Sequence, residues 1–207
     1  MTQQPESARR GIPAWLPNAL TVLRLVLVPV FVWLLFAAPT SFSWRLAATL
    51  VFGVAILTDL FDGRLARKYA LVSDFGKIWD PIADKALTGA AFIGLSILGE
   101  LPWWVTAIIL VREWGITWMR VQMLKYEVMA AAPGGKLKTV LQSVALLMFL
   151  PYPIGLTAQP FPFWFWLAWL MMGAAFILTV VTGLQYVVAA WRLRAAALAA
   201  GHSEPRA

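Results

Sequence analysis

Four aspartates in the first half of the chain stand as two pairs at helical spacing. Asp59 and Asp62 are three residues apart and Asp80 and Asp84 are four apart, so each pair shares one face of a helix. With Asp74, this stretch holds five of the ten acidic residues of a chain that is 61% hydrophobic. Because carboxylates are costly in so apolar a chain, their concentration indicates a functional site with a cationic partner.

The composition restricts which cation and which chemistry this site can use. The chain has no cysteine and one histidine, His202. Thiol nucleophiles, ordinary His/Cys zinc sites and a Ser-His-Asp triad are therefore excluded. Hard oxygen ligands select Mg²⁺ or Mn²⁺, and two such ions held by two carboxylate pairs suit in-line displacement at phosphorus.

The residues between the two pairs fit the close approach of a phosphate group. Gly63, Ala66 and Gly76 are small where the carboxylates project, which lets a nucleotide or pyrophosphate approach the backbone. Arg67 lies about one turn after Asp62 and can hold a phosphate by two parallel hydrogen bonds. A purely structural alternative, in which the aspartates only pair with nearby basic residues in a solvated loop, gives the small residues no role.

The same positions resemble the signature of the CDP-alcohol phosphatidyltransferases. From Asp59 to Asp84 the sequence reads D-x2-D-G-x2-A-R-x8-G-x3-D-x3-D, with every signature position filled. The resemblance implies six transmembrane helices, usually a homodimer, a divalent-metal site, and transfer of a phosphatidyl or similar group from a CDP-linked donor to an alcohol with release of CMP.

The resemblance also assigns roles to individual residues. Asp84 would be a metal ligand and the general base for the attacking hydroxyl. Ser73 and Asp74 stand where Thr and Asn are expected, which keeps the hydroxyl and adds a carboxylate that could alter metal preference. The implied metal ligands are Asp59, Asp62, Asp80 and Asp84, and the implied CDP-binding residues are Gly63, Ala66, Arg67, Gly76, Ser73 and Thr21.

The acceptor alcohol is indicated by segments outside this stretch. The segment N-x-L-T-x2-R from Asn18 to Arg24, the pair Arg112-Glu113 with Arg120, and GKLKT with Gln142 resemble segments of bacterial phosphatidylglycerophosphate synthases. Glycerol 3-phosphate is a dianion and would use a basic cluster that a neutral acceptor would not need. The expected acceptor-phosphate ligands are Arg24, Arg112, Arg120, Lys136 and Lys138, although Arg24 alone also fits a snorkelling arginine.

Three other functions fit part of the pattern. A cardiolipin synthase, which uses phosphatidylglycerol as acceptor, and a phosphatidylinositol-phosphate synthase belong to the same superfamily. A divalent-cation transporter would also place carboxylates in a membrane. Transport would give no role to Gly63, Ala66 and Gly76, and it would occur without any nucleotide.

These residues must be positioned by membrane helices. The mean hydropathy of +0.74 is too high for a soluble domain, and several apolar segments exceed the roughly 18 residues that a spanning helix needs. The fold class is therefore all-α, a polytopic membrane protein with a short interfacial segment before its first span. Helices are expected at about residues 19–37, 45–60, 79–98, 102–126, 138–153 and 163–190, with a connection at 64–77.

The distribution of basic residues predicts the orientation. The chain carries a formal net charge of +7, and its Lys and Arg gather on the side of both termini and of the aspartates, with Arg45 on the opposite side. By the positive-inside rule the aspartates face the cytoplasm. In a membrane protein this distribution of positive charge reports orientation and contact with anionic lipid, so we expect no nucleic-acid partner. We expect a polar N-terminus at 1–12, one membrane domain at 13–195 and a tail at 196–207, in a bacterial cytoplasmic membrane because no transit peptide is present.

Overall fold

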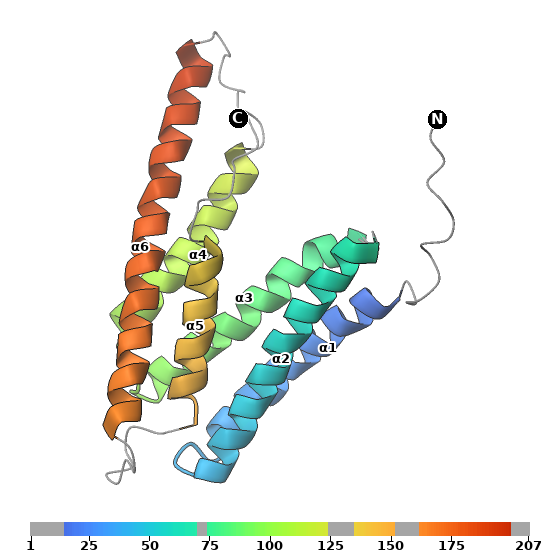
Figure 1. Cartoon of the computed structure of the whole chain (residues 1–207), viewed down its shortest axis with the longest axis vertical. Coiled ribbons are helices and arrows are strands. Elements are labelled where there is room, and N and C mark those ends of the chain that lie inside the picture. Colours follow the sequence, from blue (N-terminus) through green and yellow to red (C-terminus); the bar gives the residue numbers. More distant parts are fainter. Residues whose placement is uncertain (1–14, 70–73, 124–134, 152–161, 200–207) are drawn as a thin grey trace. The chain divides into compact units, whose positions relative to one another are not determined.

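The computed structural model describes residues 15–69, 74–123, 135–151 and 162–199 (Figure 1). These residues form six α-helices and no strand, which confirms the all-α fold class. Each helix overlaps one that the sequence predicts. The helices are α1 (Leu16–Ala37), α2 (Phe42–Tyr69), α3 (Asp74–Ile97), α4 (Trp103–Met123), α5 (Gly135–Phe149) and α6 (Pro162–Ala199).

Three of the helices are long and apolar enough to cross a membrane, judged by length and composition. They cover Asn18–Ala37, Phe42–Asp59 and Phe163–Leu193. Large apolar side chains such as Trp118, Phe163 and Trp191 point outward and are well exposed, as expected of surfaces that face lipid. The chain is therefore a membrane protein, and membrane crossing by the other three helices stays a prediction.

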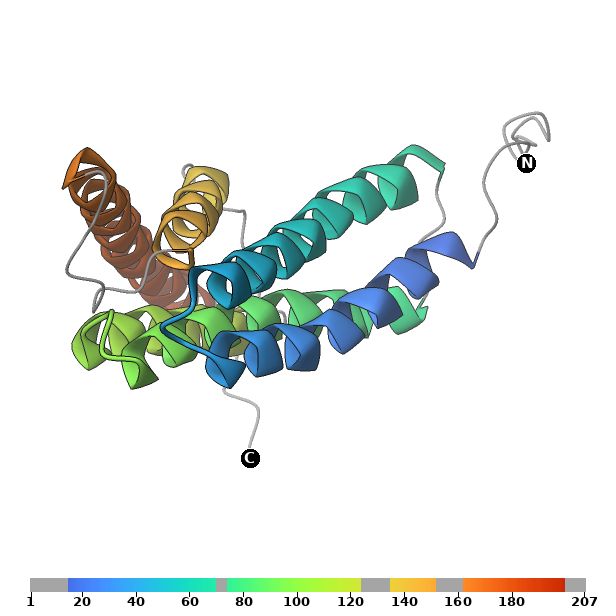
Figure 2. The same cartoon turned by 90° about the horizontal axis from the view of Figure 1, so that it is seen from below.

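The chain forms two compact units, of which the first comprises residues 1–100 and 149–158. In it α1 and α2 run antiparallel and α3 returns beside them, so α1 begins, α2 ends and α3 begins at the same end (Figures 1 and 2). This is the arrangement that brings the two aspartate pairs to one end of the unit.

An aromatic pair and a close contact at a glycine join the three helices of this unit. Phe31 of α1 meets Phe52 of α2 with ring centroids 5.5 Å apart. At Gly94 of α3, an added Cβ would lie 2.5 Å from Cδ2 of Leu35, so Leu35 of α1 packs directly against the α3 backbone and would have to move to admit a side chain there. Such contacts are how membrane helices gain packing energy without a hydrophobic driving force between them.

The predicted connection at residues 64–77 is wrong. The helix α2 continues to Tyr69 and α3 already begins at Asp74, so only residues 70–73 lie between them, outside the described residues. Arg, Leu, Ala and Lys after Gly63 are strong helix formers, and they offset the cost of about 1 kcal/mol that one glycine imposes. The same composition carries α6 to Ala199, beyond its predicted end at 190.

A Schellman motif ends α3 and directs the residue that follows it. Gly99 has a φ of 74°, its amide donates to the Ser96 carbonyl at 3.1 Å, and the Glu100 amide donates to the Leu95 carbonyl at 2.9 Å. Glycine adopts this left-handed conformation without the steric cost that a side chain brings. The motif fixes the backbone of Glu100 immediately after the helix.

The second unit comprises residues 101–148 and 159–207, with α4, α6 and nearly all of α5. The helices α4 and α6 meet through Trp104 and Phe176, whose rings lie edge to face with centroids 5.4 Å apart. The indole of Trp164 in α6 donates to the Met148 carbonyl at 3.0 Å. The buried polar residues described in this unit are Thr106 of α4, Lys138 and Gln142 of α5, and Thr179 and Thr182 of α6.

Candidate active site

In the first unit, two residues of α1 hold one aspartate from each of the neighbouring helices. The Thr21 hydroxyl donates to Oδ1 of Asp80 on α3 at 2.5 Å. Arg24 Nη1 lies 2.8 Å from Oδ1 of Asp59 on α2. Thr21 and Arg24 are three residues apart on one face of α1 and are 1% and 0% exposed. This face of α1 therefore fixes carboxylates that the sequence places 21 residues apart.

These contacts give Thr21 and Arg24 protein partners in addition to their predicted roles. Thr21 was predicted to bind CDP and Arg24 to bind the acceptor phosphate, and both assignments stay predictions. Because Arg24 is fully buried and paired with Asp59, it also balances the charge of a predicted metal ligand. The snorkelling alternative is wrong, since a snorkelling side chain places its head group in water.

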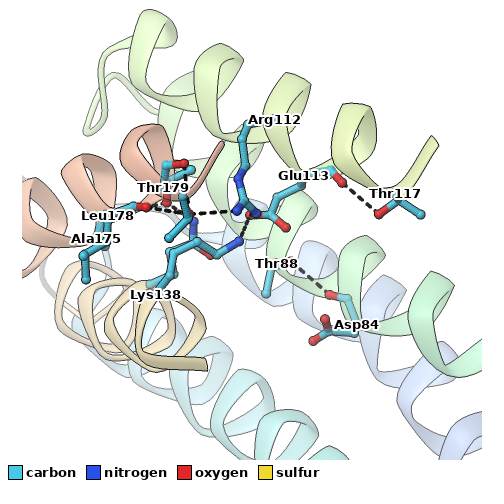
Figure 3. Close-up of polar contacts among 11 residues, drawn as sticks. Asp84, Thr88, Arg112, Glu113, Thr117, Lys138, Ala175, Leu178 and Thr179 are labelled. Atoms are coloured by element: carbon cyan, nitrogen blue, oxygen red, sulfur yellow. Dashed lines mark hydrogen bonds and ion pairs between the residues drawn. The ribbon is translucent and has the colours of Figure 1, made fainter. Parts of the chain in front are cut away.

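The aspartates that can be described suit a hard divalent cation. The side chain of Asp59 is 39% exposed, and Asp80 and Asp84, one turn apart on α3, are partly exposed. Thr88 donates to the main-chain carbonyl of Asp84 at 3.0 Å (Figure 3). Oxygen donors from two helices, without sulfur or imidazole, fit Mg²⁺ or Mn²⁺.

Part of the predicted site lies outside the side chains that the structure describes. The side chain of Asp62 is not among those described. Among the described side chains, no group of three or more possible ligands stands in position to hold a metal. The backbones of Asp62, Gly63, Ala66 and Arg67 are helical in α2, that of Gly76 in α3, that of Arg120 in α4 and that of Lys136 in α5, whereas Ser73 lies outside the described residues.

In the second unit, Arg112 and Lys138 converge on one carboxylate. Lys138 Nζ forms an ion pair with Oε1 of Glu113, and Arg112 Nη1 lies 3.3 Å from the same oxygen (Figure 3). Lys138 is 4% exposed, so its charge is held almost out of solvent. Two cations and one anion leave this cluster with a net positive charge, which suits an anionic ligand.

The helix α6 completes this basic cluster, and its role was missed from the sequence. Arg112 Nη2 donates to the Thr182 hydroxyl at 2.8 Å, and Gln142 Nε2 donates to the Thr179 hydroxyl at 3.0 Å. Both threonines are buried. Their spacing of three residues within a long apolar helix was the available signal, because it places two hydroxyls on one face.

Comparison with known proteins adds to this geometry. The sequence model of the CDP-alcohol phosphatidyltransferase family matches residues 14–182 of this chain. The chain belongs to this family. A probable phosphatidylglycerophosphate synthase of Mycobacterium tuberculosis is 46% identical over 199 residues, covering 93% of this chain and 90% of that protein.

Two further bacterial proteins are similar to this chain over most of its length. CDP-diacylglycerol–glycerol-3-phosphate 3-phosphatidyltransferase of Bacillus subtilis is 35% identical over 190 residues, covering 85% of this chain and 95% of that protein. The protein of the same name from Pseudomonas fluorescens is 36% identical over 185 residues, covering 85% and 90%. The family membership predicted from the Asp59–Asp84 pattern is thus confirmed.

Proposed function

We propose that this CDP-alcohol phosphatidyltransferase transfers the phosphatidyl group of CDP-diacylglycerol to glycerol 3-phosphate, giving phosphatidylglycerophosphate and CMP. The family membership supports the reaction class and the donor. The observation that carries the acceptor is the convergence of Arg112 and Lys138 on Glu113. The sequence predicts both cations as ligands of the acceptor phosphate, and their shared carboxylate keeps them together before an anion binds.

The aspartates carry the chemistry at the β-phosphorus. Asp59, Asp62, Asp80 and Asp84 would hold Mg²⁺ or Mn²⁺, which when bound neutralises charge on the pyrophosphate and on the leaving CMP. Thr21 and Arg24 keep Asp80 and Asp59 in place. Asp84 accepts the proton of the primary hydroxyl as that oxygen bonds to the β-phosphorus, and the bond from this phosphorus to the oxygen of CMP breaks.

The bilayer and the cytosol supply the two substrates. The acyl chains of CDP-diacylglycerol stay in the bilayer, and Gly63, Ala66, Arg67, Gly76 and Ser73 line the site of its CDP group. Glycerol 3-phosphate enters from the cytosol. The positive-inside distribution supports this orientation in a bacterial cytoplasmic membrane, and the family resemblance supports a homodimer.

The test is an acceptor competition with purified protein. CDP-diacylglycerol is incubated with glycerol 3-phosphate, phosphatidylglycerol and inositol phosphate together, with Mg²⁺ or Mn²⁺, and the lipid product is identified by mass. We expect phosphatidylglycerophosphate as the main product. Cardiolipin or an inositol lipid as the main product would overturn the acceptor assignment and leave the reaction class standing.

A parallel measurement addresses the transporter alternative. Release of CMP from CDP-diacylglycerol is followed with and without chelator, and metal flux is followed in vesicles without nucleotide. We expect metal-dependent CMP release. Flux without CMP release would overturn the enzyme assignment.

A further inference from the structure

One face of α6 is shaped to receive the side chain of Arg112. Gly183 is buried, and a Cβ added there would lie 3.1 Å from Cγ of Arg112, 3.6 Å from Nε and 3.9 Å from Cδ. The aliphatic part of the arginine therefore lies directly against the backbone of α6. A Cβ at this position would require the arginine stem to shift by a few tenths of an ångström, and a larger side chain would displace it further.

Two neighbours on the same face hold the guanidinium. Thr182 donates its one hydroxyl hydrogen to the Leu178 carbonyl at 2.6 Å, so its oxygen is left to accept from Arg112 Nη2 at 2.8 Å. The ring of Tyr186, one turn farther along, lies with its centroid 5.8 Å from Cζ of Arg112, within the range of a cation–π contact. Arg112 is thus fixed through its stem, one terminal nitrogen and one face.

The guanidinium keeps hydrogen-bonding capacity beyond these contacts. Among the described residues its buried Nε has no hydrogen-bond partner, and Nη1 reaches Glu113 only at 3.3 Å. Arginine binds phosphate best through two nitrogens in a fixed plane, so an orientation set by α6 matters more here than charge alone.

We propose that Thr182, Gly183 and Tyr186 are positioning residues that seat Arg112 for the phosphate of the acceptor and so set the affinity of the acceptor site. The proposal rests on the function proposed above. It assigns a role to α6, which contains none of the residues predicted from the sequence for the site, and Gly183 and Tyr186 lie beyond residue 182, where the family match ends.

The test is a size series at Gly183 with a control on the same helix. An added Cβ meets no atom within 4 Å at Gly173, so Gly173→Ala changes α6 equally in helix propensity without touching Arg112. We expect Gly183→Ala to raise the KM for glycerol 3-phosphate and Gly183→Val to raise it further, to about tenfold, the loss that one displaced charged hydrogen bond produces. The KM for CDP-diacylglycerol should change in none of the three.

A second pair of variants separates positioning from folding. Thr182→Ser keeps the accepting oxygen and should retain the KM of the wild type, whereas Thr182→Val should raise it as Gly183→Ala does. Tyr186→Phe keeps the ring that contacts Arg112 and should raise the KM for glycerol 3-phosphate less than Tyr186→Leu, which removes it. Thermal unfolding in detergent reports whether each variant is folded.

The outcomes distinguish this inference from the proposed function. Suppose that the wild-type protein makes phosphatidylglycerophosphate but the folded Gly183 and Thr182→Val variants keep the acceptor KM of the wild type. This result overturns the positioning role of α6 and leaves the proposed function standing. An equal rise in the donor KM also overturns the positioning role. If the wild type uses another phosphorylated acceptor, the KM for that acceptor is compared in the same variants, and an unchanged KM overturns the positioning role of α6. Exclusive use of a neutral acceptor overturns both.

Discussion

Arg45 of α2 holds Glu100, in the turn after α3, by two hydrogen bonds, 2.8 Å from Nη1 to Oε1 and 2.6 Å from Nη2 to Oε2. Its Nε also donates to the Leu150 carbonyl at 2.6 Å, just after the end of α5. Both side chains are buried, Arg45 at 0% and Glu100 at 5% exposed. One buried arginine thereby joins three segments that are far apart in the sequence.

Replacement of Arg45 should markedly lower the unfolding temperature of the protein. Arg45→Met leaves the carboxylate of Glu100 buried without its cation, a defect that typically costs about 3 to 5 kcal/mol. Thermal unfolding in detergent measures the loss. Arg192→Met, which removes an exposed arginine from α6, should leave the unfolding temperature almost unchanged. Equal unfolding temperatures for the two variants would show that the ion pair does not stabilise the fold.

The penalty in Arg45→Met should depend on pH. Burial raises the pKa of Glu100 above its ordinary value of 4.5, and the hydrogen bond and charge of Arg45 oppose that rise. Without Arg45 the pKa rises further. A carboxyl whose pKa is higher in the folded state binds more protons there, so folding stability falls as pH rises from 4.5 through the folded pKa.

The difference in unfolding temperature between wild type and Arg45→Met should therefore be larger near pH 8 than near pH 5. Unfolding scans across this range provide the measurement. The double variant Arg45→Met/Glu100→Gln has no carboxyl to titrate and should lose this pH dependence. A pH-independent penalty in Arg45→Met would contradict the assignment of the effect to Glu100.

The sequence predicted well what depends on residue type and spacing. The six helices and the face shared by each aspartate pair follow from hydropathy and from helical periodicity, and the structure brings Asp59 and Asp80 to the same face of α1. The end of α2 and the start of α3 differ from the prediction, because charged residues beyond a membrane segment form helix as readily as loop. Tertiary partners could not be predicted in this way. Arg45 counted only as a charge opposite the aspartates, since nothing local points to Glu100.

Thr21 should act through Asp80. Its hydroxyl donates to Oδ1 of Asp80, and such outer contacts to a metal ligand typically change metal affinity or activity by about 10- to 100-fold when removed. We expect Thr21→Val to raise the Mg²⁺ or Mn²⁺ concentration for half-maximal activity, whereas Thr21→Ser should not. The activity of each variant is titrated with metal after treatment with chelator. A raised KM for CDP-diacylglycerol with unchanged metal dependence would instead support the predicted contact of Thr21 with CDP.

Lys138 should be required for the acceptor more than for the donor. Replacing it with Met removes a buried charge and leaves Arg112 as the remaining cation beside Glu113 among the described side chains. We expect the KM for glycerol 3-phosphate to rise by about tenfold or more, because charge-assisted hydrogen bonds to phosphate are lost. Steady-state kinetics with each substrate varied in turn provide the measurement, and Lys138→Arg, which keeps the charge, should be less affected. Equal changes in both KM values would argue against the acceptor assignment.

Asp84 should be required for the chemical step and not for binding the donor. Asn at this position keeps the size of the side chain and cannot take the proton of the attacking hydroxyl, a contribution of about 100-fold or more. We expect Asp84→Asn to abolish CMP release while CDP-diacylglycerol still binds, as measured by competition with a labelled CDP-lipid. Asp74→Asn provides the matched control, because it restores the Asn that the family pattern expects there, and it should stay active. Activity of Asp84→Asn near that of wild type would remove Asp84 from the mechanism, and loss of donor binding would make it a ligand-positioning residue instead of the base.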